Sequence, residues 1–348
     1  TLVVEFVIMA AVLMARPWGL GGRAPDIGTV TVGQTAAPLT HQVGWVIVGL
    51  GLLGLPFWVA PESYFWVMAI DVLIATLFVL GLSWLMGFGG MDSFGHAAYF
   101  GVGAYTTALL SLAGISTNCL ALILGPMAAG LLALVFGALC VRLSGVYLAM
   151  LSLALAQVVW GVAFEWDGLT GGSNGLNGVK LPMWLQFKSN FYLLAFTLTA
   201  MASAGLWRLN QSPFGLSLRA SRDAPVRAES LGISVTQVRW LAWVIAGSLA
   251  GLAGSLFAWT KGGVSPEVLS LHQSLNGLVM VLLGGLGSHA GPWLGALVFN
   301  ELQDELTRLT EYWRLGLGLV LLGLVLVLPQ GLVGCLNQGR RLLQKWGT

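Results

Sequence analysis

The side chains that could take part in chemistry gather in one stretch, residues 212–239. Only 9% of the 348 residues are charged, yet this stretch holds Arg219, Arg222, Asp223, Arg227, Glu229 and Arg239. No nucleophile paired with a base and no cluster of metal ligands stands out in the sequence. The three cysteines are scattered without CxxC spacing, so they imply neither a disulfide framework nor a metal site. The sequence gives little support to an enzyme, and the stretch is either a solvated basic loop or a surface for a partner.

A second group of polar residues, in GGMDSFGHAAYFGVGAY, precedes an apolar run that begins near residue 96. Glycines at such a break expose backbone groups, and the N-terminus of a helix favours an anion. Ser93 and His96 are three residues apart, so on a helix they would share a face. The alternative is that Ser93 caps the helix and His96 bonds a neighbouring helix. Gln157 is a third ligand-binding candidate, with helix packing as its alternative role.

Composition indicates what surrounds these residues. Hydrophobic residues make up 57% of the chain, and so few charges cannot cover a water-exposed surface. Several apolar runs have the length of about 17–25 residues that a helix needs to cross a bilayer. They lack the alternation of barrel strands. The sequence therefore predicts an all-α, polytopic integral membrane helical bundle of about ten transmembrane helices, in which many of the 48 glycines allow close helix packing.

The predicted helices follow the apolar runs. They lie at residues 42–60, 65–84, 96–112, 119–140, 145–165, 190–207, 238–260, 273–287, 290–303 and 314–329. The pair 273–287 and 290–303 is interrupted by GGLGSHAGP, so it forms either two short helices or one kinked or re-entrant segment. Asp71 falls within one run; it is either a functional group inside the bilayer or a residue near the outer surface.

Orientation follows from lysine and arginine, which stay on the cytoplasmic side of a membrane. Five arginines between residues 208 and 239 place the charged stretch in the cytoplasm. Arg340, Arg341 and Lys345 place the C-terminus there as well. The loop at residues 166–189 is then expected to face outward, where its Gly- and Asn-rich sequence could meet an external partner.

Several segments, taken in order, resemble the permease subunits of ABC importers for branched-chain amino acids. They are GLSWLMGFGGMDSFGHAAYFGVGAYTTALL, VRLSGVYLAMLSLALAQVV with LTGGSNGL, SPFGLSLRASRDAPVRAESLGISVTQVRW and LVMVLLGGLGSHAGPWLGALV. The resemblance covers about residues 42–335 and points to the second, M-type permease. It implies a multi-pass protein of the plasma (inner) membrane. The implied partners are a companion permease, two cytoplasmic ATPase subunits and an external substrate-binding protein, with membrane lipid around the chain and no nucleic acid.

The resemblance also assigns a role to the charged stretch, which matches the loop that couples such permeases to their ATPases. The residues carried over are Arg222, Arg227, Ala228, Glu229, Leu231 and Gly232. Physically, Ala228 and Leu231 would share a helical face, Pro225 suits a first turn and Gly232 suits a C-terminal stop. The chain holds no phosphate-binding loop motif, so ATP is expected on partner subunits and no cofactor on this chain.

Predicted domain boundaries follow from the same resemblance and from a repeated motif. The motif Pro-x-Gly-Leu-x-Gly occurs at residues 17–22 and again at 329–334. Residues 1–24 therefore resemble the tail of the companion permease, with chance similarity as the alternative. Residues 25–41 are a cytoplasmic linker, 42–335 the permease domain and 336–348 a basic cytoplasmic tail.

The predicted function is ATP-driven import of leucine, isoleucine or valine. Ser93, His96 and Gln157 are the candidates for the substrate pathway. Two alternatives stay open: an importer of urea or short amides from the same family, and a carrier or channel driven by an ion gradient. The second alternative needs membrane-embedded ion ligands, for which Asp71 alone is a poor candidate.

Overall fold

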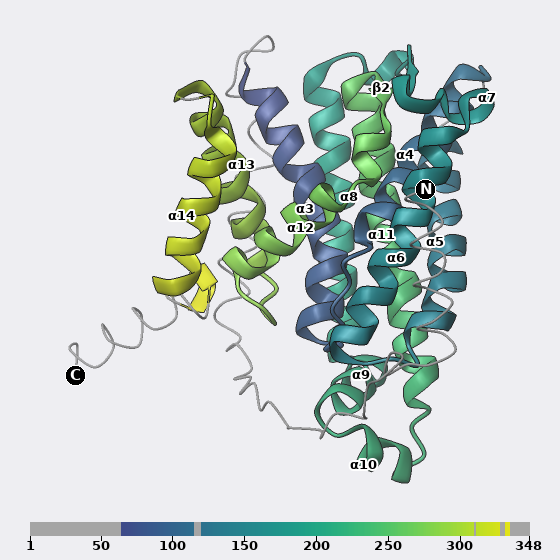
Figure 1. Cartoon of the computed structure of the whole chain (residues 1–348), viewed down its shortest axis with the longest axis vertical. Coiled ribbons are helices and arrows are strands. Elements are labelled where there is room, and N and C mark those ends of the chain that lie inside the picture. The colour runs from purple at the N-terminus through teal and green to yellow at the C-terminus, as the bar shows by residue number, and fades with distance from the viewer. Residues whose placement is uncertain (1–63, 115–119, 310, 328–330, 335–348) are drawn as a thin grey trace.

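The computed structural model describes residues 64–114, 120–309, 311–327 and 331–334. Within these ranges the chain is a bundle of helices (Figure 1). The long helices are α3 (Phe65–Gly87), α4 (His96–Leu112), α5 (Leu120–Cys140), α6 (Gly145–Glu165), α8 (Lys188–Gln211), α11 (Val235–Lys261), α12 (Leu271–Gly284), α13 (Gly291–Leu309) and α14 (Trp313–Val327). Shorter elements are α7 (Asp167–Thr170), α9 (Pro213–Asp223) and α10 (Pro225–Ser230).

Nine of the ten predicted apolar runs fall on helices of the described residues. Two predicted ranges agree to the residue at both ends, since the runs 96–112 and 145–165 are α4 and α6. The ambiguous pair forms two separate helices, α12 and α13, with a break between them. The run 42–60, the predicted tail 1–24 and the linker 25–41 lie outside the described residues, as does the basic tail 336–348.

The all-α membrane bundle is confirmed, whereas the number of crossings stays a prediction. In the part of the chain that the structure describes, five helices are long and apolar enough to span a bilayer: α3, α5, α6, α8 and α11. α12 and α14 have only 14 and 15 residues. The second half of α13 carries charged side chains, among them Glu301, Asp304 and Arg308.

The centre of the bundle is α11, which packs against α3, α4 and α5. Its small residues allow backbone-to-backbone contact with α4: Gly254 lies against the carbonyl of Phe100, and Gly103 of α4 lies against Gly251. Close approach of this kind is how helices associate in lipid, where no hydrophobic force drives them together. One buried side-chain hydrogen bond, 2.6 Å from Trp243 Nε1 to the Tyr99 hydroxyl, joins the same two helices.

The two ends of the bundle differ in character. α9 and α10 project from one end, and the segment that contains α7 lies at the other (Figure 1). There, β1 (Leu176–Asn177) pairs antiparallel with β2 (Gly263–Val264), directly after α11. The relative placement predicted for the charged stretch and the loop 166–189, at opposite ends, is confirmed.

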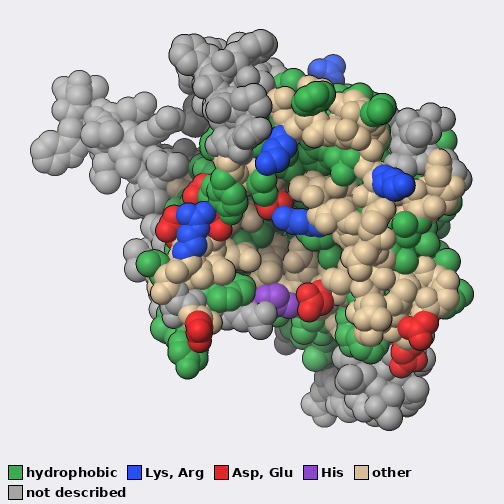
Figure 2. Space-filling model, turned by 90° about the horizontal axis from the view of Figure 1, so that it is seen from above, with side chains coloured by type: hydrophobic (Ala, Val, Ile, Leu, Met, Phe, Trp, Pro, Cys, Tyr) green, Lys and Arg blue, Asp and Glu red, His purple; other side chains and the backbone are tan. Residues whose placement is uncertain are grey.

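Asp71 lies toward the end that carries β1 and β2. Its carboxylate pairs with Lys261 Nζ at 2.9 Å, and both side chains are partly exposed. Figure 2 shows this end, where acidic, basic and histidine side chains surround a hollow. Of the two roles considered for Asp71, the structure supports the surface one, because a group paired at the rim of the bundle is no isolated charge in its interior.

The contact between α4 and α11 predicts that Gly254→Ala destabilises the fold. A Cβ at residue 254 would collide with the backbone of Phe100, and such overpacking costs about 1–3 kcal/mol. Gly205 of α8 is the matched control, since its Cβ would meet nothing within 4 Å. We expect Gly254→Ala to lower the thermal midpoint of the purified protein by several degrees. Equal midpoints for Gly254→Ala and Gly205→Ala would contradict this account of the packing.

Candidate functional site

The charged stretch folds as two short helices between α8 and α11. Ser212 begins α9, and its hydroxyl accepts a hydrogen bond from the Gly215 N–H at 3.5 Å. Pro213 occupies the first turn of α9, and Pro225 occupies the first turn of α10 as predicted. Proline suits this position because the first N–H groups of a helix have no intrahelical partner.

The end of α10 confirms one prediction and corrects another. Gly232 has φ +83°, and its N–H donates to the Glu229 carbonyl at 2.9 Å, so it stops the helix as predicted. The predicted shared face of Ala228 and Leu231 is wrong. Ala228 is buried, whereas Leu231 lies beyond the last helical residue, Ser230, and is 75% exposed. The three-residue spacing fails because the helix ends one residue too early.

The outcome is an exposed tip with apolar and charged side chains, which we define as Val226, Arg227, Glu229 and Leu231. Val226 is 71% exposed, and the two charged residues are exposed as well. Ala228 alone points inward. Large apolar side chains at a solvated tip, bordered by charges, are typical of a surface that meets a protein partner.

Arg222 belongs to a different environment from Arg227, although both were predicted to act together. Its Nη1 donates to the backbone carbonyl of Gly87, at the end of α3, and its Nε pairs with Asp223 at 2.8 Å. The aliphatic part of Arg222 lies against Gly90, which has φ +62°. The side chain is only 15% exposed. The structure therefore divides the predicted loop residues into an exposed tip and an inward-facing arginine.

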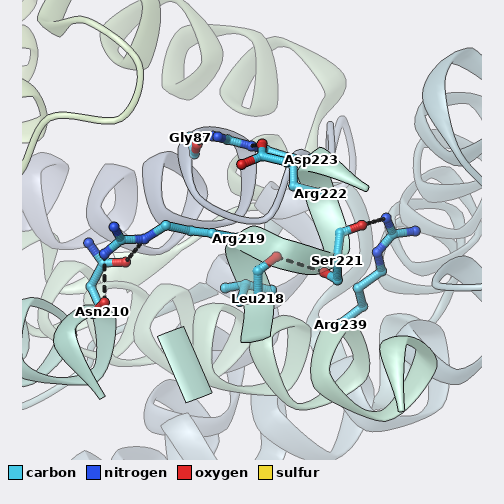
Figure 3. Close-up of polar contacts among 8 residues, drawn as sticks. All are labelled: Gly87, Asn210, Leu218, Arg219, Ser221, Arg222, Asp223 and Arg239. Atoms are coloured by element: carbon cyan, nitrogen blue, oxygen red, sulfur yellow. Dashed lines mark hydrogen bonds and ion pairs between the residues drawn. The ribbon is translucent and has the colours of Figure 1, made fainter. Parts of the chain in front are cut away.

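Sequence analysis missed the residues that join this loop to the bundle. Arg219 donates through Nη2 to the Asn210 carbonyl at 2.6 Å and through Nε to the Asn210 side chain at 3.2 Å (Figure 3). Arg239 of α11 donates to the Ser221 carbonyl at 2.5 Å. The available signal was the three-residue spacing of Arg219 and Arg222, which places both on one face of α9.

His289, in the break between α12 and α13, completes this set of contacts. Its Nε2 lies 3.1 Å from Asn210 Nδ2, and its ring stacks on Phe88 with centroids 5.1 Å apart. The guanidinium of Arg219 lies over the Phe88 ring, 5.5 Å from its centroid. Burial, and then the charge of Arg219, lower the pKa of His289 to about 4.

The candidate pathway residues Ser93 and His96 are both fully buried, at the start of α4. The His96 ring packs against Phe78, 5.3 Å between centroids. The carbonyl of Phe78 is near this ring, but neither ring nitrogen makes a hydrogen bond of normal geometry, and the same is true of the Ser93 hydroxyl. Buried polar atoms without partners are uncommon and costly, which keeps both residues of interest.

The alternative role for Ser93, capping of α4, is not what the structure shows. Gly95 is the residue before the helix, and no side chain of its own segment caps it. Hydroxyls of two other helices serve instead: Ser274 of α12 accepts from the Ala97 N–H at 3.0 Å, and Ser152 of α6 accepts from the Phe94 N–H at 3.1 Å. Sequence reasoning missed both serines because nothing local marks them.

Gln157 lies on α6, five residues beyond Ser152, and its Nε2 is buried without a hydrogen-bond partner. Among the described residues, Gln157 thus resembles Ser93 and His96 in having a buried polar atom without a hydrogen-bond partner. The described residues also contain no group of three or more side chains suited to hold a metal ion.

The left-handed conformation of Gly232 generates a test of the tip. Gly232→Val should destabilise the end of α10, because a residue with a side chain pays about 1–2 kcal/mol to adopt a φ near +80°. The added Cβ would meet no neighbouring atom within 4 Å, so backbone strain is the expected effect rather than a steric clash. Tryptic cleavage at Arg227 should then be about five- to thirtyfold faster, in proportion to the opened population. Gly232→Asn is the control, since asparagine tolerates this conformation. Identical cleavage of all three proteins would refute the role of Gly232 as a helix stop.

Several known proteins are similar to this chain in sequence. The chain is 31% identical, over 284 residues, to the high-affinity branched-chain amino acid transport system permease protein LivM of Salmonella typhimurium, covering 73% of this chain and 66% of that protein. It is 25% identical over 280 residues to LivH of the same system and organism, covering 74% and 90%. It is 32% identical over 196 residues to the autoinducer 2 import system permease protein LsrC of Klebsiella pneumoniae, covering 53% and 55%.

The chain thus spans about two thirds of the length of the LivM proteins that it matches. No solved structure is significantly similar to it. The model of one family, described as the permease component of the branched-chain amino acid transport system, matches residues 66–328. Because this match covers most of the helical bundle, the chain belongs to the branched-chain amino acid transport permease family.

Proposed function

We propose that this chain is a permease subunit of an ATP-driven importer that moves branched-chain amino acids into the cytoplasm. The observation that carries the proposal is the exposed tip of α10, held at one end of an apolar helical bundle that belongs to this permease family. A permease that uses ATP needs a cytoplasmic element that an ATPase can grip. The relatives named for branched-chain amino acid transport support the choice of substrate.

The tip then faces the cytoplasm and docks an ATPase subunit, on which ATP is bound and hydrolysed. Val226 and Leu231 offer apolar contact, while Arg227 and Glu229 offer charges that fix orientation. The opposite end, with its mixed charges and the ribbon of β1 and β2, faces outward and receives the substrate-binding protein. A companion permease completes the transmembrane unit, and the C-terminus is cytoplasmic.

Within the bundle, Ser93, His96 and Gln157 are the candidates for the substrate pathway. Their unpartnered polar atoms supply donors and acceptors in an otherwise apolar interior, as a polar solute that crosses a membrane protein requires. α4 begins beside them, and the N-terminus of a helix carries partial positive charge. The pathway opens only when neighbouring helices move, because both Ser93 and His96 are fully buried in this conformation.

The decisive experiment is uptake by proteoliposomes that contain this chain, its companion permease and the ATPases. Labelled leucine and labelled urea are compared, each with the external binding protein, with and without internal ATP. We expect leucine uptake that needs ATP and falls at least tenfold in a Glu229→Ala/Gly232→Val double variant. Leucine uptake without ATP would reject the ATP-driven importer in favour of a gradient-driven carrier. ATP-dependent uptake of urea alone would preserve the mechanism and overturn the substrate.

Asp71 provides a second, sharper test between the two mechanisms. A gradient-driven carrier would use this carboxylate as an ion ligand, and Asp71→Asn would abolish its transport. In an ATP-driven permease, Asp71→Asn removes only a partly exposed ion pair with Lys261, which is worth about 1 kcal/mol or less. We expect ATP-dependent leucine uptake to stay within about twofold of the unmodified protein. The matched variant is Lys261→Met, which removes the same pair and keeps the carboxylate.

A further inference from the structure

We infer that α9 carries the movement of the loop into the bundle through two arginines, and that both arginines converge on the break between α12 and α13. We call Arg219, Arg222 and their acceptors Asn210 and Gly87 the arginine clamp. The inference rests on the proposed function, since it concerns how movement of the ATPases would reach the pathway. It assigns positioning roles to residues that contact neither ATP nor the substrate.

The tip alone cannot transmit force across the bundle, because its contacts are few. α10 packs against α9 and the beginning of α11, with Ala228 as its one buried side chain. α9 in turn packs against α8 and α11, with Gly215, Leu218 and Ser221 buried. A displacement of α10 therefore reaches the other helices through α9.

The first arm of the clamp is Arg222. It donates to the carbonyl of Gly87, in the last turn of α3, where helix carbonyls lack intrahelical partners and favour a cation. Gly90 permits the close approach, because any Cβ there would collide with the Arg222 side chain. The end of α3 lies against the break, because the backbone of Gly87 contacts that of Gly287. A Cβ atom added to Gly87 would lie only 2.6 Å from the Gly287 nitrogen.

The second arm is Arg219, which reaches the same break through an amide. Asn210 Oδ1 accepts from Arg219 Nε, so Asn210 Nδ2 faces His289 as a donor. His289 Nε2 must then be the unprotonated nitrogen, with the ring proton on Nδ1. Because its pKa is lowered to about 4, His289 keeps this acceptor throughout the neutral range. The link is therefore constant between about pH 6 and 8.

The break has a backbone conformation that depends on glycine. Gly285 and Gly287 have φ +103° and +76°, which residues with a side chain rarely adopt. α12 begins beside the buried polar residues, since Ser274 caps α4 at Ala97. Displacement of the break would thus move α12, which contacts the start of α4 next to Ser93 and His96. The clamp thus connects the exposed tip to the candidate pathway through a continuous series of contacts, which runs from the loop through the arginines and the break to α12 and α4.

The test compares uptake with ATP hydrolysis in the reconstituted importer. We expect Arg222→Ala to lower leucine uptake per ATP hydrolysed about tenfold, as loss of one charge-assisted hydrogen bond predicts, while ATP hydrolysis stays within about twofold. Arg222→Lys, which keeps the charge and is the milder change for folding, should lower the ratio less. Arg142→Ala is the matched control, because Arg142 is an exposed arginine between α5 and α6.

A second readout separates transmission from a merely structural role. Spin labels on Leu216→Cys of α9 and Leu286→Cys of the break, each paired with a label on Leu131→Cys of α5, use exposed positions and a background in which the native cysteines are alanine. With ATP, both distances should change in the unmodified clamp. In Arg222→Ala, the distance from α9 should still change, whereas the distance from the break should change less than in the unmodified protein, because only the Arg219 arm remains.

The outcomes are distinguishable. An unchanged uptake-to-hydrolysis ratio in Arg222→Ala, or a break that moves as far as in the unmodified protein, would overturn the clamp. So would a parallel loss of uptake and hydrolysis in Arg222→Lys, because the arginine would then serve ATPase docking or stability. Absence of ATP-dependent uptake in the unmodified protein would instead reject the proposed function.

Discussion

The structure depends on how closely helix backbones approach one another around α11. In a bilayer, each helix satisfies its own hydrogen bonds, and the contacts between helices are set by side-chain size. Glycines in α4 and α11 let Gly254 meet the Phe100 carbonyl and Gly103 meet Gly251. α3 follows the same rule where Gly81 lies against the backbone of Ala246. This packing fixes the positions from which the polar residues act.

Polar interactions, by contrast, concentrate where helices begin or end. Ser152 and Ser274 cap the start of α4 from other helices. Arg222 satisfies a carbonyl at the end of α3, and Arg219 fixes the amide of Asn210. Polar side chains are useful at these places, because the terminal backbone groups of a helix have no intrahelical partner. The two arginines proposed to transmit movement therefore also satisfy backbone carbonyls near the ends of α3 and α8.

Much of the fold follows from the sequence, since apolar length is a strong signal in a membrane protein. The bounds of α4 and α6 were predicted to the residue, and the break between α12 and α13 follows from its glycines and proline. Gly232 was predicted as a helix stop because only its own conformation is involved. Leu231 was misplaced because its exposure depends on a helix that ends one residue earlier.

The candidate site was less accessible to sequence reasoning, for a physical reason. Arg222 and Arg227 look alike in the sequence, yet one is turned inward to Gly87 and the other is exposed. Asn210, His289 and Ser274 act on partners 9 to 177 residues away. Such pairings depend on how helices cross, which local spacing does not encode. The family resemblance indicated that the loop matters, but only the structure distinguishes its exposed tip from the arginine clamp.

The uninterrupted course of α11 has a thermodynamic consequence. This helix of 27 residues, about 40 Å long, begins next to α10 and ends at the β-ribbon on the other face. If the ligands at the two ends each bind one position of α11 more tightly than another, binding at one end alters the free energy of binding at the other. By linkage the effect is reciprocal: if docking of a substrate-loaded binding protein strengthens ATPase closure by some factor, closure strengthens that docking by the same factor. A single rigid helix, α11, would thus allow ATP hydrolysis to depend on the presence of the transported substrate, without a further regulatory element.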